Sequence, residues 1–145
     1  MSEQAASVAV VSAQPRNKVL HVALWVVQIL LGLAFGFAGF MKLTQPIATL
    51  GHNMPWTLVV PAALVRFIGA SELAGSLGLL LPSLTRILPR LSALAGLGLT
   101  VVMILAMGFH ISRGEMYGIP PTLVLGLLAA FVAWGRFSKA PIDPR

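Results

Sequence analysis

Cysteine is absent from all 145 residues of the chain. This excludes disulfide bonds, thiolate nucleophiles and cysteine-bound iron–sulfur clusters within the chain itself, because each of them needs cysteine sulfur. Aspartate occurs once, at Asp143 near the end of the chain, which argues against a Ser-His-Asp catalytic site. Electron transfer by this protein would therefore need a bound organic molecule or a partner protein.

Histidine is also scarce, with only His21, His52 and His110 in the sequence. A pair of axial haem ligands would have to lie at one depth on facing helices, but His21 is expected at the opposite membrane surface from the other two and His52 falls in a loop. We therefore expect no haem or metal site. The Gly96-x-Gly98 pair is not a nucleotide-binding motif, because no strand precedes it.

Charged residues make up only 10% of the chain and hydrophobic residues 57%, whereas about a quarter of the residues in soluble domains are charged. Four apolar runs are each close to the ~20 residues that cross the hydrocarbon of a bilayer. They predict an all-α integral membrane four-helix bundle with up-down topology. The spans are expected at about residues 20–40, 61–81, 91–109 and 119–137, within one domain at 19–137, between a disordered tail at 1–18 and a C-terminal tail at 138–145.

Basic residues are distributed unequally about these spans. One side holds seven of them, namely Arg16, Lys18, Arg86, Arg90, Arg136, Lys139 and Arg145. Lysine and arginine are enriched in cytoplasmic segments, so both termini are predicted to be cytoplasmic. The formal net charge of +6 is then explained by topology and by contact with lipid, and not by nucleic-acid binding.

Glu72 lies near the middle of the second apolar run. A charged side chain at the centre of a spanning helix costs roughly 2.5 to 3.5 kcal/mol, so such residues usually face the bundle interior and have a partner. Gly69, Gly75 and Ser76 share its helical face, and these small neighbours indicate an internal position. We interpret Glu72 as the centre of a binding or proton-handling site, with a structural ion pair as the alternative.

Other polar candidates are predicted near the outer ends of the spans. Lys42, Arg66, His110, Arg113 and Glu115 are all expected in the outer third of the bundle, with Glu72 deeper. Lys42 or His110 could reach Glu72, which would otherwise stay protonated. Thr100, Met103, Met107 and His110 share one face of the third span, where the methionines are either core residues or ligand contacts. The inner half of the spans carries no charge until their ends, so the outer half is predicted to hold the polar pocket.

Several short motifs together resemble the DoxX and DoxX-like family. They are Gly39-Phe40-Met41-Lys42-Leu43, then Gly69-Ala70-Ser71-Glu72-Leu73-Ala74-Gly75, then His110 at the end of the third span and Gly135-Arg136 at the end of the fourth. The resemblance implies a small four-helix protein of the bacterial inner membrane, in a family named after a subunit linked to quinone-dependent oxidation of sulfur compounds. It also implies that Lys42, Glu72 and His110 line the pocket.

Three functions follow as hypotheses. The first is a membrane subunit or accessory of an oxidoreductase system, which binds a quinone or another lipophilic molecule in the outer half of the bundle and receives electrons from a protein partner. The second is a non-catalytic scaffold of a membrane complex. The third is proton-coupled transport by a homo-oligomer, since four helices rarely enclose a transport path alone. The sequence assigns no catalytic residue to the chain.

Overall fold

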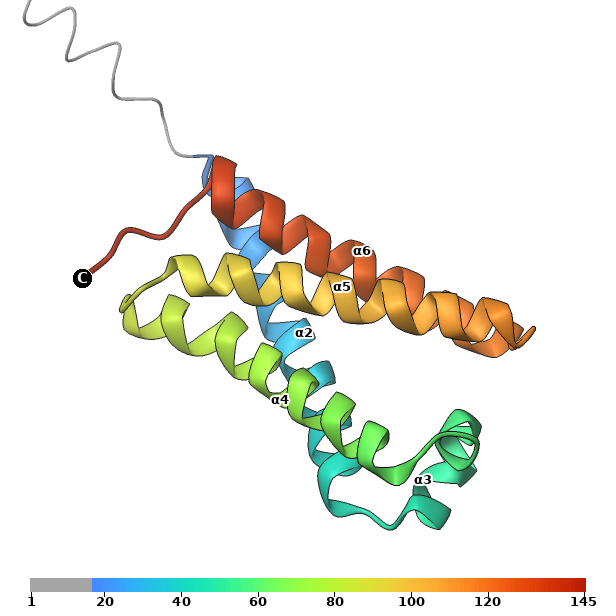
Figure 1. The fold of residues 1–145 in the computed structure, drawn as a ribbon. Coiled ribbons are helices and arrows are strands. Elements are labelled where there is room, and N and C mark those ends of the chain that lie inside the picture. The colour runs from blue at the N-terminus through green and yellow to red at the C-terminus, as the bar shows by residue number, and fades with distance from the viewer. Residues whose placement is uncertain (1–16) are drawn as a thin grey trace, which may run out of the picture.

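The computed structural model describes residues 17–145, and all of the regular structure in this range is helical. Four long helices dominate it, α2 (Lys18–Thr44), α4 (Ala62–Thr85), α5 (Arg90–Ser112) and α6 (Ile119–Trp134), and a short helix, α3 (Ile47–Asn53), lies between the first two (Figure 1). Two 3-10 segments, Pro55–Leu58 and Met116–Gly118, precede α4 and α6, and a π-helical turn, Gly135–Lys139, extends α6.

Four helical segments are long and apolar enough to cross a membrane: Lys18–Thr44, Ala62–Thr85, Arg90–Ser112 and Met116–Lys139. The predicted four-helix membrane fold is therefore confirmed. Each segment extends beyond the predicted apolar run at one end or both, because flanking residues continue the backbone hydrogen bonding after the run ends. At the start of α2, for example, the Asn17 side chain accepts a hydrogen bond from the Leu20 amide at 3.1 Å. The tail predicted at 1–18 lies outside the described residues except for its last two.

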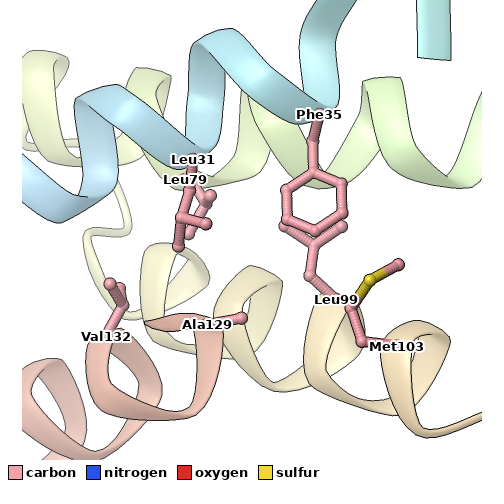
Figure 2. Packing of buried hydrophobic residues seen from close by; sticks show 7 residues of the cluster. All are labelled: Leu31, Phe35, Leu79, Leu99, Met103, Ala129 and Val132. Carbon is pink, nitrogen blue, oxygen red and sulfur yellow. The ribbon is translucent and has the colours of Figure 1, made fainter. Parts of the chain in front are cut away.

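The core between the helices is small and apolar. Its buried cluster takes residues from all four long helices, namely Leu31, Phe35, Leu79, Leu99, Met103, Ala129 and Val132 (Figure 2). Many large apolar side chains point away from this core, and Phe37 and Phe67 are each 69% exposed. Such an outer surface suits contact with lipid hydrocarbon, so the bundle lies in contact with the bilayer.

The helices pack mainly as two consecutive pairs, α2 with α4 and α5 with α6. Glycine allows the closest approach within each pair. A Cβ atom on Gly39 of α2 would lie 2.6 Å from the Gly69 carbonyl oxygen of α4, and one on Gly96 of α5 would lie 3.0 Å from the Ala129 carbonyl oxygen of α6. Small residues are therefore needed where the two backbones of each pair meet.

The connections divide the bundle into two ends. We call one the basic end: it holds the start of α2, the α4–α5 turn and the C-terminal segment, whose Arg145 amide donates to the Arg86 carbonyl oxygen at 2.9 Å (Figure 1). We call the other the loop end: it holds the α2–α4 connection, including α3, and the α5–α6 connection. The loop end also holds Lys42, Arg66, His110, Arg113 and Glu115.

Candidate functional site

Lys42 and Glu72 form a buried ion pair between α2 and α4. Lys42 lies in the last turn of α2, and its Nζ donates a hydrogen bond to Glu72 Oε2 at 2.6 Å. The two residues are only 5% and 4% exposed. Glu72 lies on the buried face of α4, as its small neighbours indicated. Of the two bases that could have reached Glu72, Lys42 is the one that pairs with it.

Arg66 binds the end of α2 instead of binding Glu72. Its Nη1 donates a hydrogen bond to the Lys42 carbonyl oxygen, one of the carbonyl groups that a helix leaves without an intrahelical partner at its C-terminus. A cation there also interacts favourably with the helix dipole. Arg66 therefore fixes the backbone of the residue whose side chain holds Glu72.

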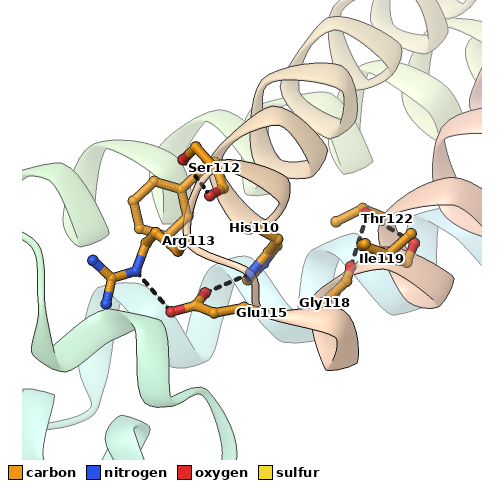
Figure 3. A network of polar contacts seen from close by, with 8 residues as sticks. His110, Ser112, Arg113, Glu115, Gly118, Ile119 and Thr122 are labelled. Carbon is orange, nitrogen blue, oxygen red and sulfur yellow. Dashed lines mark hydrogen bonds and ion pairs between the residues drawn. The ribbon is translucent and has the colours of Figure 1, made fainter.

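A second polar cluster lies in the α5–α6 connection (Figure 3). Glu115 accepts a hydrogen bond from Arg113 Nε at 2.7 Å, and its other oxygen lies 2.8 Å from His110 Nδ1. Gly114, at φ +67°, makes the turn that brings Glu115 back toward His110. Gly118 packs against the His110 ring, where a Cβ atom would clash with the imidazole. The glycines of this connection thus hold His110 and Glu115 together.

Two aromatic rings link these clusters. Lys42 Nζ lies 5.9 Å from the centre of the Trp56 ring, which meets Phe109 edge to face at 6.4 Å between ring centres. Phe109 in turn contacts the His110 ring at 5.7 Å. No hydrogen bond or ion pair within residues 17–145 joins Glu72 to His110. The predicted group of polar residues is therefore two clusters at one end of the bundle, with aromatic rings between them.

The remaining candidates of α5 lie away from these contacts. Thr100 donates its hydroxyl hydrogen to the Gly96 carbonyl oxygen of its own helix at 2.7 Å. Met103 belongs to the apolar core, and Met107 is half-buried. These positions agree with the interpretation of the methionines as core residues more than with a role in ligand contact.

The residues that hold the site lie within a stretch that matches a known family. The model of the DoxX-like family matches residues 26–132, which include Lys42, Glu72, His110 and Glu115. The chain belongs to the DoxX-like family. No curated protein and no solved structure matches it significantly. Family membership supports a multi-pass membrane protein. It does not determine the chemistry, which depends on the residues of the site.

One polar cluster of this DoxX-like protein was not predicted from its sequence. The inner half of the bundle was predicted to lack a polar site, but Arg136 is buried at the basic end, 3% exposed, and its Nε donates to Gln28 Oε1 at 2.6 Å. That prediction was wrong because Arg136 was counted among the basic residues after the fourth span. Gln28, a polar amide inside the first apolar run, was the available signal.

Glu115 gives the loop end a pH dependence that can be measured. The hydrogen bond from Arg113 lowers the pKa of the Glu115 carboxyl below its ordinary value, and the His110 contact adds to this effect. A carboxyl whose pKa is lowered on folding stabilises the folded loop above its unfolded pKa of about 4.3. This stabilisation is lost as the pH falls through the lowered folded pKa.

We expect Arg113→Gln to raise the pKa of Glu115 toward the ordinary value, because the largest cause of its lowering is removed. A carboxyl ¹³C NMR titration of glutamate-labelled protein would measure the shift, with Glu115→Gln identifying the signal. Arg90→Gln, an exposed change at the basic end, serves as the control. A Glu115 midpoint that is the same in wild type and Arg113→Gln would contradict the assignment.

Proposed function

We propose that this DoxX-like protein is a membrane subunit or accessory of an oxidoreductase system and binds a quinone or a related lipophilic molecule at the loop end. The observation that carries the proposal is the Trp56–Phe109 pair, with Lys42–Glu72 on one side and His110–Glu115 on the other. A quinone is a flat ring with carbonyl oxygens at two positions. Aromatic surfaces flanked by hydrogen-bonding groups suit such a ring.

The polar residues have distinct roles in this proposal. Lys42 Nζ would donate a hydrogen bond to one carbonyl oxygen, and Glu72, already in contact with Lys42, would hold or release a proton. His110 would act through Nε2, because Nδ1 is held by Glu115. A bound quinone would supply the capacity to take up electrons and protons. The electrons would come from a partner protein, since the chain has no cysteine for a redox centre of its own.

A scaffold role is the second candidate, and one observation favours it. The α2–α4 contact already provides hydrogen-bond partners for Glu72, which binds the Lys42 ammonium, and for Arg66, which binds the Lys42 carbonyl oxygen. Buried ion pairs of this kind can fix helix register without binding a ligand. In this case the loop end would hold the bundle in shape for a partner complex, and the polar groups would have no separate role in turnover.

Mass spectrometry of the protein purified gently from its native membrane would distinguish the two. We expect quinone to accompany the wild type. The amount retained should fall about 10-fold or more in Glu72→Gln, because this variant loses the charge-assisted contact with Lys42, and such a contact contributes about 1.5 to 3 kcal/mol. Ser138→Ala is the control, since this hydroxyl bonds only within its own helix at the basic end. Equal quinone in wild type and a folded Glu72→Gln would contradict the pocket, and a stable partner complex without quinone would favour the scaffold.

A further inference from the structure

Arg136 is held at the basic end by contacts from several parts of the chain. Besides its bond to Gln28, its Nη1 lies 3.1 Å from His21 Nδ1 and donates to the Ala140 carbonyl oxygen at 3.0 Å. Its guanidinium carbon lies 5.5 Å from the centre of the Trp25 ring. These contacts join the start of α2 to the end of the fourth span.

Local backbone geometry explains why Arg136 is inside. The helix changes from α to π at Gly135–Lys139, and the Ala140 amide donates to the Gly135 carbonyl oxygen at 2.7 Å, five residues back. Gly135 itself packs directly on the Leu24 side chain of α2. The close approach at Gly135 and the widened turn together place the next residue, Arg136, among buried groups.

Among residues 17–145, no hydrogen bond or ion pair joins Arg136 to a carboxylate. The acceptors of its described hydrogen bonds are an amide oxygen, a carbonyl oxygen and a ring nitrogen. Its Nη2 is buried and has no hydrogen-bond partner among residues 17–145. A buried charged donor without an acceptor is costly. Arginine forms its strongest contacts with carboxylate and phosphate oxygens, often with two parallel hydrogen bonds.

His21 and Trp25, which both contact Arg136, also line a cavity of about 270 Å³ at the basic end. The other lining residues are Ser83, Arg86, Ile142 and Asp143. Arg86 donates from Nε to the Asp143 carbonyl oxygen at 3.0 Å, so the C-terminal segment forms part of the cavity wall. Within residues 17–145, the cavity lining and Arg136 together carry two guanidinium groups, on Arg86 and Arg136, and one carboxylate, on Asp143, so positive charge is in excess there.

We propose that the basic end binds a phosphate oxyanion, held by Arg136 Nη2 inside and by the Arg86 guanidinium at the rim. The phosphate could belong to the headgroup of an anionic lipid or to free inorganic phosphate. Gln28 and Lys42 are both on α2, fourteen residues apart, so this site lies about 21 Å along the helix from the Lys42–Glu72 pair. It is separate from the proposed quinone site.

The test measures whether a ligand raises the thermal unfolding midpoint of the full chain in detergent in a saturable way. Tryptophan fluorescence monitors the unfolding. Short-chain phosphatidylglycerol is compared with short-chain phosphatidylcholine, and sodium phosphate with sodium chloride at equal ionic strength. We expect a saturable rise in the unfolding midpoint with phosphatidylglycerol, which would identify a lipid source, or with free phosphate, which would identify the ion. No saturable rise with either one would overturn the proposal, and so would equal rises with the two lipids when free phosphate gives no more than sodium chloride.

Variants assign the effect to the two arginines. Arg136→Lys keeps the charge but removes the Nη2 donor, and should weaken binding about 10- to 100-fold, as expected for a hydrogen bond to a charged group. Arg86→Gln should weaken it about 3-fold, because this side chain is exposed. Arg90→Gln removes the same charge from an exposed position outside the cavity lining and should leave binding unchanged. If Arg136→Lys fails to fold, equal binding by Arg86→Gln and Arg90→Gln would still overturn the site.

Discussion

Glu72→Leu is expected to destabilise the bundle by about 3 to 5 kcal/mol, because it leaves the Lys42 ammonium buried without its partner. Lys42→Met should have a similar effect, since it leaves the carboxylate unpaired. The double variant Lys42→Met/Glu72→Leu should recover most of the loss, because apolar residues of similar size can replace a buried ion pair at little cost. The free energy of reversible unfolding in mixed detergent micelles would measure all three changes.

The double variant also separates stability from function. If the pair serves only to fix α2 against α4, the double variant should behave like the wild type in every assay. If it holds a quinone, the double variant should be stable and should retain no more quinone than Glu72→Gln. A double variant as unstable as the sum of its single variants would show that the two residues do not interact energetically.

Gly39→Ala is expected to have the second large effect, a loss of about 1 to 3 kcal/mol from overpacking. The new Cβ would lie 2.6 Å from the Gly69 carbonyl oxygen and 2.7 Å from the Leu73 amide nitrogen. Both atoms belong to the backbone and cannot rotate away, so α2 and α4 would have to separate. This separation would also stretch the nearby Lys42–Glu72 contact.

Gly98→Ala is the matched control for this change. Gly98 is also inside a spanning helix, but its Cβ would meet no atom within 4 Å. Alanine there should raise stability by about 0.5 to 1 kcal/mol, because glycine loses more conformational freedom in a helix. The same unfolding measurement applies to both variants, and a similar loss for Gly39→Ala and Gly98→Ala would rule out the close contact as the cause.

The four spans could be predicted because length and apolar character are local properties of the sequence. The burial of Glu72 was predictable for a similar reason, since one carboxylate inside an apolar run is visible without a structure. Its partner was not, because Lys42 and His110 are expected at compatible depths. The choice depends on how the helices rotate and pack. The Gly39–Gly69 contact brings α2 close to α4, so that Glu72 pairs with Lys42. His110 pairs with Glu115 instead.

The site at the basic end was not predictable because its cause is a change of helix type. Five residues are too few for their apolar pattern to distinguish a π-helical turn from a regular α-helix, so nothing in Gly135–Lys139 marks the wider turn. Arg136 then resembles the other basic residues that flank the spans. Only the packing of Gly135 on Leu24 and the bond to Gln28 distinguish it from them.

Both members of the Lys42–Glu72 pair belong to the first two spans, and this has a consequence for biosynthesis. The ribosome completes α2 and α4 before it makes α5, so the two opposite charges can meet as soon as the first hairpin leaves the translocon. Glu72 alone, near the middle of its helix, would add roughly 2.5 to 3.5 kcal/mol to the insertion of that helix. We therefore expect the second span to enter the membrane as part of a hairpin. Lys42 would then be the first counter-ion of Glu72, before any later helix, subunit or lipid could take this role.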